Sequence, residues 1–282
     1  MKSKLELILF AFLIYMPLTI SAQDENLFEG ELHYRSMENQ NESIIKWSCG
    51  MAYNGARNTT YLIKGNKVLF RDESTHMCTL LDPDNNKVTL YSDLIGKGME
   101  FDYKKYTSSY LSVFSKEGPN TAFPQLAPSV YRFTVTEEKK QFLNLDVEYV
   151  QGRIENKSSS TSFDIYRTNS IKLPHTMNVV QLYGIEIDGL IAKFVYEQEV
   201  RGPFGMNLKG YVYSELQEIN SRTIDNAELN VPSNIVINYS ESPFKIVNLY
   251  KENSKHLKKH NIFPTQKNTD VVYKIDDENW DF

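Results

Sequence analysis

Two histidines near the end of the chain have the spacing of metal ligands. His256 and His260 are four residues apart, so on a helix both would project from one face. Four lysines between positions 251 and 259 surround them, and no third ligand is close in the sequence. We therefore favour a solvated helix face and expect neither a metal nor a cofactor.

The acidic residues offer two further candidates for chemistry. Residues 82–86 resemble the start of a calcium-binding loop, but Lys87 stands where that loop needs glycine, so a hairpin turn is the simpler interpretation. Glu197 and Glu199 alternate with other side chains as on the wet face of a strand, which does not indicate a catalytic pair. The chain also lacks the nucleophile-elbow, zinc-protease and phosphate-loop motifs. We therefore expect no enzymatic activity.

The first 22 residues have the pattern of an export signal. Lys2 and Lys4 precede an apolar run over residues 7–17, and Ile20-Ser21-Ala22 ends on a small residue suited to cleavage. The run is shorter than the roughly 20 residues that span a bilayer. We expect cleavage after Ala22 and no transmembrane segment in the mature chain; an uncleaved anchor is the alternative.

Charge and composition limit the partners of the protein. The formal net charge of the 282 residues is −5 and becomes −6 when Lys2, Lys4 and Glu6 leave with the signal. An acidic chain with interspersed charges has no electrostatic basis for binding nucleic acid. The 18 tyrosines and 15 phenylalanines favour strands. The length suits one large β domain or two small ones.

Cys49 and Cys78 are the two cysteines of the chain. Their spacing excludes a CxxC redox motif, and two thiols alone do not make a zinc site. In an oxidising compartment a structural disulfide between them is our favoured interpretation. Two buried free thiols are the alternative.

Residues 57–92 carry the clearest signal of the fold. β-Branched, aromatic and aliphatic runs occupy residues 59–63, 67–70, 77–81 and 88–91. Residues 64–66 and 82–86 separate these runs, and Gly65 can supply a positive φ in a turn or bulge. The pattern predicts antiparallel strands joined by tight turns.

Strand patterns continue along most of the chain. Further strands are predicted over residues 28–34, 43–51, 130–136, 142–153, 162–167, 178–187, 190–200 and 207–219. Residues 93–99 indicate a connection, residues 118–128 a long loop, and residues 101–116 either a short helix or a loop. The fold class expected is mainly β, with a curved antiparallel sheet forming an open or half barrel over a few short helices.

The composition changes after residue 237. Ser242-Pro243 suits the start of a helix that would run to about residue 259. Basic residues end this helix, and acidic residues follow it. We predict a β domain over residues 23–237 and a C-terminal helical or irregular appendage over residues 238–282.

Several motifs in a fixed order carry a resemblance to a known group of proteins. The segment FEGELHY is followed by YLIKGNKVLFRD, MCTLLDPDNNKVTLYS and IDGLIAKFVYEQEV, and a late extended piece closes on Val231-Pro232-Ser233. In this order they resemble exported β-rich proteins of Gram-negative bacteria in the LolA/LppX-like lipoprotein-carrier superfamily. The resemblance covers about residues 28–237.

The resemblance implies a sheet wrapped over helices, with an apolar cavity that takes a lipid or acyl chain, in the periplasm or outer envelope. The residues expected to line its concave face are Leu62, Val68, Phe70, Leu80, Leu90, Leu145, Val147, Phe194 and Tyr196. The chain differs from the carriers by entering a strand soon after Gln23 and by its C-terminal appendage. A structural or protein-interaction module, with an envelope protein as partner and no small ligand, is the alternative.

Overall fold

The computed structural model describes residues 27–40, 55–111, 130–155, 159–177, 188–201, 207–242, 245–260 and 262. The strands are β1 (Gly30–Gln40), β2 (Gly55–Lys64), β3 (Lys67–Asp72), β4 (Met77–Asp82), β5 (Lys87–Ser92), β6 (Lys97–Asp102), β7 (Val130–Phe142), β8 (Leu145–Glu155), β9 (Ser159–Thr168), β10 (Leu190–Arg201), β11 (Asn207–Ser221) and β12 (Val236–Tyr239). The helices are α3 (Tyr103–Leu111), the short 3-10 helix η2 (Asn226–Leu229) and α5 (Ile246–Lys259). The mainly β fold class is confirmed.

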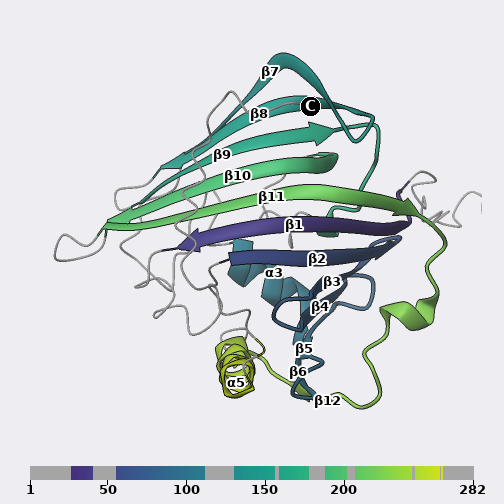
Figure 1. Cartoon of the computed structure of the whole chain (residues 1–282). Helices are drawn as coiled ribbons and strands as arrows, with labels where there is room; N and C mark the ends of the chain where they lie inside the picture. The colour runs from purple at the N-terminus through teal and green to yellow at the C-terminus, as the bar shows by residue number, and fades with distance from the viewer. Residues whose placement is uncertain are drawn as a thin grey trace, which may run out of the picture.

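All twelve strands belong to one sheet, in the order β12-β6-β5-β4-β3-β2-β1-β11-β10-β9-β8-β7. Neighbouring strands are antiparallel except β12 and β6, which are parallel. The sheet is strongly curved, and its edge strands β7 and β12 do not meet (Figure 1). The predicted open, curved sheet is therefore confirmed.

The turns between β2 and β5 form where the sequence predicts them. Gly65 has a φ of 56° in the turn between β2 and β3, a conformation that glycine adopts without steric cost. Residues 83–86 connect β4 to β5, with the Asn86 amide donating to the Pro83 carbonyl at 3.0 Å. Local turn chemistry therefore fixes these hairpins.

The predicted strand over residues 142–153 is wrong at its start. β7 continues to Phe142, and Leu143 and Asn144, with φ values of 47° and 64°, turn the chain into β8. Two consecutive left-handed residues suit the twist of a two-residue hairpin. The sequence carries no glycine at this turn, so its signal is weak.

The predicted connection over residues 93–99 is wrong in its second half, because β6 begins at Lys97. β6 pairs along its whole length with β5. Gly98 lets β12 approach, since a Cβ there would lie 2.5 Å from Cδ1 of Ile237. Of the two interpretations left open for residues 101–116, the structure contains the helix, as α3.

The face of the sheet that carries α3 and α5 is called here the inner face. Cross-strand partners share a face, so the pairing of Tyr61 with Phe70, Phe70 with Thr79, and Thr79 with Leu90 traces it. At β4 to β6 the helices α3 and α5 complete a buried cluster, whose members are Met77, Leu81, Val88, Leu90, Phe101, Tyr106, Ile246 and Leu249. None of the helices among the described residues is long and apolar enough to cross a membrane.

The opposite, outer face carries Glu31, His33 and Arg35 on β1 and is covered beyond β2 by the chain that follows β11. Leu62, Leu69, Cys78, Leu80 and Tyr91 project from this face and pack against Ile224, Leu229 and Ile235. The segment containing η2 thus crosses the outer face on its way to β12 (Figure 1).

The boundary predicted after residue 237 falls inside β12, whose last residues pair with β6. Helix α5 is tied to the sheet by Asn253, which is 2% exposed. Its Nδ2 donates to the Thr75 carbonyl at 2.8 Å, and its Oδ1 accepts from the Ser92 hydroxyl at 2.7 Å. The helix begins at Ile246, later than a cap at Ser242 predicts.

Four expectations concern residues outside those that the structure describes. They are the signal over residues 1–22, the strands over residues 43–51 and 178–187, and the loop over residues 118–128. Cys49 also lies outside the described residues, so its pairing with Cys78 stays a prediction.

Candidate functional site

The nine residues predicted to line one concave face do not share a face. Leu62 and Leu80 belong to the outer-face cluster, while Val68, Phe70 and Leu90 lie on the inner face. Leu145 packs against the cluster that contains Val68, Val147 is 1% exposed and Phe194 is half-buried; the side chain of Tyr196 is outside the described part. The prediction that these residues share a face is wrong because all six residues of β4 are buried. Apolar and polar residues therefore do not alternate there, and the sequence does not show which side chains lie on which face.

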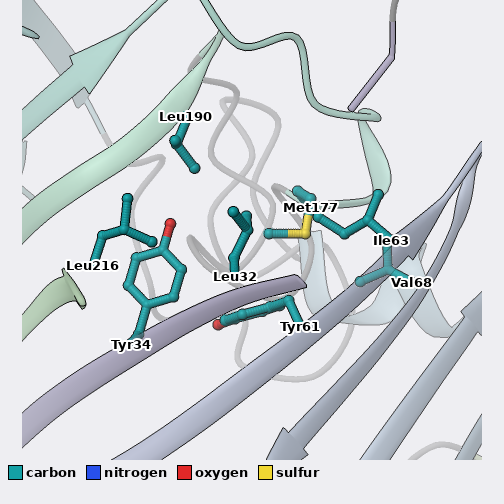
Figure 2. Close-up of a cluster of buried hydrophobic side chains, with 8 residues drawn as sticks. All are labelled: Leu32, Tyr34, Tyr61, Ile63, Val68, Met177, Leu190 and Leu216. Atoms are coloured by element: carbon teal, nitrogen blue, oxygen red, sulfur yellow. The ribbon is translucent and has the colours of Figure 1, made fainter. Parts of the chain in front are cut away.

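The inner face holds three aromatic rings in mutual contact. The rings of Tyr34 and Tyr61 are 5.4 Å apart at 78°, and those of Tyr61 and Phe70 are 5.1 Å apart at 49°. Edge and tilted contacts of this kind are favourable for aromatic quadrupoles. The Tyr34 hydroxyl donates to the Ile191 carbonyl at 2.7 Å, so its buried oxygen is satisfied. Figure 2 shows Tyr34 and Tyr61 with Leu32 between the two halves of the sheet.

The segment after β9 covers one end of this cluster. Met177 is 2% exposed and packs against the side chains around Leu32 and Ile63 (Figure 2). The Thr176 hydroxyl donates to the Asn66 carbonyl at 2.8 Å, and the Phe28 amide donates to the Lys172 carbonyl at 2.8 Å. These bonds hold the segment over the ends of β1 and β2.

Phe194 lies further along the inner face. It pairs with Ser214 on β11, which pairs with Ser36 on β1, and the two serine hydroxyls are 2.8 Å apart. Phe194 is half-buried, as is Phe70. The inner face between β3 and β10 therefore offers partly covered aromatic rings whose polar neighbours bond to each other.

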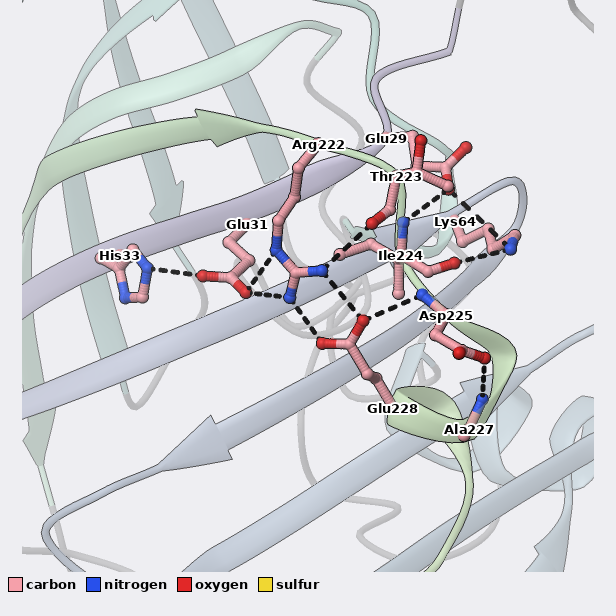
Figure 3. A network of polar contacts seen from close by, with 10 residues as sticks. All are labelled: Glu29, Glu31, His33, Lys64, Arg222, Thr223, Ile224, Asp225, Ala227 and Glu228. Atoms are coloured by element: carbon pink, nitrogen blue, oxygen red, sulfur yellow. Dashed lines mark hydrogen bonds and ion pairs between the residues drawn. The ribbon is translucent and has the colours of Figure 1, made fainter.

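A charged network on the outer face attaches the segment after β11 (Figure 3). Arg222 donates through Nε to Glu31 at 2.9 Å and through a terminal nitrogen to Glu228 at 2.9 Å. The bond to Arg222 holds the pKa of Glu31 below its usual range and lowers the pKa of Glu228 to about 2. Glu228 also completes a capping box with Asp225 at the start of η2. The network is a structural clamp.

His33 lies between a carboxylate and a hydroxyl, an arrangement that the sequence did not indicate. Its Nε2 is 3.1 Å from Glu31, and its Nδ1 is 3.0 Å from the Thr60 oxygen. The Thr60 hydroxyl donates to Glu73 at 2.9 Å, so its proton points away from the imidazole. Thr60 is therefore not positioned as a nucleophile activated by His33.

Cys78 is a buried thiol, with its sulfur 3.6 Å from a carboxylate oxygen of Asp93. Burial, with the charge of Asp93, raises the pKa of this thiol to about 12. Burial likewise raises the pKa of the neighbouring Tyr91. A thiol that stays protonated is a poor nucleophile.

Two other candidates from the sequence are the histidine pair and Asp82. The His256 and His260 rings are 4.3 Å apart at the C-terminal end of α5, and no group of three potential metal ligands occurs among the described residues. Asp82 accepts from the Asn85 side chain at 3.0 Å and lies 3.2 Å from Lys67 Nζ. Burial acts to raise the pKa of Asp82, but these bonds outweigh it and lower the pKa.

The chain matches no protein-family model and no curated protein sequence. Among solved structures it is similar to a crystal structure of MucB in complex with MucA(peri), at 11% identity over 70% of this chain and 90% of that chain, with a TM-score of 0.11. A score this low carries no argument about function. The resemblance to lipoprotein carriers therefore stays a prediction.

Proposed function

We propose that this chain is an exported envelope protein that holds an acyl chain or another apolar ligand against the inner face of its sheet. The main support is the partly covered aromatic surface between β3 and β10. Phe70 and Phe194 are half-buried there, whereas α3 and α5 pack at β5 and β6. Small-molecule sites are mostly apolar surfaces with a few placed polar groups.

The polar groups of this surface favour an apolar ligand over a polar one. The hydroxyl of Tyr34 bonds to a backbone carbonyl, and the hydroxyls of Ser36 and Ser214 bond to each other. A polar ligand would have to break these bonds to be recognised, which leaves buried groups unsatisfied. An alkyl chain contacts only the rings and aliphatic side chains.

Titration with a fluorescent fatty acid tests the proposal. The wild type should bind the probe saturably, and Phe194→Ser should lose that binding while keeping its circular dichroism spectrum. Tyr166→Ser is the matched control, because Tyr166 is also a half-buried aromatic residue, on the neighbouring strand and the outer face. A folded wild type that shows no saturable binding would overturn the proposal.

The export part of the proposal rests on the basic, apolar and small-residue order of the first 22 residues. Intact-mass measurement of the protein recovered from the envelope should give a chain that begins at Gln23. A mature protein that retains Met1 would contradict it.

An interaction role is the second candidate, and the exposed edge of β12 favours it. Val236 and Tyr239 are 63% and 62% exposed, on a strand that pairs only with β6 within the described sheet. Unpaired edges can accept a strand from a partner. In that case a photo-crosslinking residue at position 239 should capture an envelope partner, and one at the exposed Asn248 should not.

A further inference from the structure

A row of paired residues crosses four strands of the outer face. Tyr149 on β8 pairs with Tyr166 on β9, Tyr166 pairs with Lys193 on β10, and Lys193 pairs with Glu215 on β11. Glu215 pairs in turn with Arg35 of β1, which places the row on the outer face. These four residues are called here the tyrosine row.

Two ammonium groups lie against the aromatic rings of the row and of the neighbouring Tyr213. The Tyr149 and Tyr166 rings are 5.2 Å apart at 32°. Lys193 Nζ lies 6.0 Å from the centre of the Tyr166 ring and 5.2 Å from that of Tyr213, and Lys140 Nζ lies 5.5 Å from that of Tyr166. Cations at these distances are attracted to the ring faces. Lys193 is 4% exposed, whereas the three tyrosines are only half-buried, so part of each tyrosine is accessible.

Carboxylates fix the outer ends of two rings. The Tyr149 hydroxyl donates to Asp164 at 2.5 Å, and the Tyr213 hydroxyl donates to Glu215. A carboxylate has acceptor capacity beyond one such bond, so Asp164 and Glu215 can also accept from a ligand. Rings held in this way lose little conformational entropy when a ligand binds.

Charges of both signs border the row. Lys140, Lys193 and Arg35, which pairs with Glu215, are positive, whereas Asp164 and Glu215 are negative. An anionic ligand would be attracted by the cationic side chains and repelled by the two carboxylates. A cationic ligand would compete with the ammonium groups that already lie against the rings. The surface is therefore complementary to a neutral ligand with apolar faces and a rim of hydroxyl groups.

We propose that the tyrosine row binds a neutral carbohydrate, with sugar rings stacked on Tyr149 and Tyr166 and their hydroxyls bonded to Asp164 and Lys140. A pyranose presents C–H groups on its faces, which pack on aromatic rings, and hydroxyls at its edge. The row crosses several strands that are about 4.8 Å apart, so it favours linked sugars over a monosaccharide. The buried Lys193 contacts the Tyr166 and Tyr213 rings and positions them. This site is on the other face of the sheet from the proposed apolar site.

Calorimetric titration with three neutral oligosaccharides tests the site: hexamers of β-1,4-linked glucose, of β-1,4-linked N-acetylglucosamine and of α-1,4-linked glucose. Burial lowers the pKa of Lys193 to about 8, so the titrations are run at pH 7, where this amine is mostly protonated. We expect saturable binding of at least one hexamer. Tyr166→Ser should weaken it about tenfold or more, while Tyr166→Phe, which keeps the ring, should change it by less than about threefold.

Two controls distinguish binding at the tyrosine row from binding to the inner face and from binding driven by charge. Phe194→Ser alters the inner face and should leave oligosaccharide binding unchanged, so failure of the acyl-chain proposal and failure of this one give different results. Affinity should also be nearly independent of salt, because screening acts on charged ligands. The proposal is overturned if the folded wild type binds none of the hexamers, if Tyr166→Ser binds as the wild type does, or if an anionic oligosaccharide binds more tightly.

Discussion

Asn253 gives the sharpest test of how α5 is held to the sheet. In Asn253→Ala the Thr75 carbonyl and the Ser92 hydroxyl each lose a buried bond of 2.8 Å or 2.7 Å. An unsatisfied buried polar group costs about 1–3 kcal/mol. Ser92 keeps its bond from the Ile95 amide at 3.3 Å, and alanine gains about 0.6 kcal/mol of helix propensity. We expect a net loss of about 2–4 kcal/mol in the free energy of unfolding.

Asn248→Ala is the matched control, because Asn248 is exposed on the same helix. It makes the same gain in helix propensity without removing the two buried bonds of Asn253, so its stability should stay within about 0.5 kcal/mol of the wild type or rise slightly. Urea denaturation followed by circular dichroism gives both free energies, provided that the m values agree. Equal stabilities for the two variants would refute the argument that these buried bonds hold the helix.

Asn253→Asp adds a test of the donor alone. The aspartate can still accept from Ser92 but, when ionised, cannot donate to the Thr75 carbonyl. Burial should raise its pKa above the unfolded value of about 3.9. The folded state then binds more protons, so stability should rise as the pH falls through the raised pKa. A variant whose stability relative to the wild type does not change with pH would contradict this placement.

Three further predictions follow from other buried groups. Burial lowers the pKa of Lys193 to about 8, below its unfolded value of about 10.4. The free-energy cost of burying the protonated amine therefore applies in full below this folded pKa and disappears as the pH rises to the unfolded pKa. Lys193→Met should therefore raise the free energy of unfolding at pH 7 by up to about 3 kcal/mol. The variant should also lack the increase in stability that deprotonation of Lys193 gives the wild type as the pH rises. Urea denaturation from pH 7 to 10 measures both effects, and equal stability of the two proteins at pH 7 would refute the prediction. Gly98→Ala should destabilise the protein, because the new Cβ would lie 2.5 Å from Ile237 Cδ1 and 2.8 Å from a backbone oxygen; an unchanged thermal midpoint would show that β12 can shift freely. In a Cys49→Ser variant, Cys78 should resist a thiol reagent at pH 8 until the protein unfolds, because its pKa is about 12; rapid labelling of the folded variant would contradict its burial.

The sequence predicted hairpins well where turn residues were explicit. Gly65 and the Asp-Pro-Asp-Asn-Asn run mark the turns within residues 57–92, and the apolar runs between these turns correspond to β2 to β5. The turn at Leu143 and Asn144 was missed because leucine rarely adopts a positive φ. There the pairing of β7 with β8 imposes the turn, and the local sequence does not indicate it.

For the candidate site, the sequence predicted the types of residue but not their arrangement in space. Apolar residues on strands indicated a buried surface, but β4 is buried on both sides, so Leu80 on one face and Leu81 on the other look alike in the sequence. The tyrosine row was missed for a different reason. Its members come from four separate strands, and only their register brings them together.

The sequence by itself determined most of the described strands, though not β6 or β12, together with several turns and the mainly β fold class. It could do so because backbone preference and turn geometry act over a few residues. Tertiary structure alone decided that β1 pairs with both β2 and β11, that β12 adds in parallel to β6, and which side chains face α3 and α5. Those outcomes depend on contacts between segments as far apart as Gly30 and Ser221. Their free energy comes from burying remote surfaces against each other, and no local pattern records which surfaces meet.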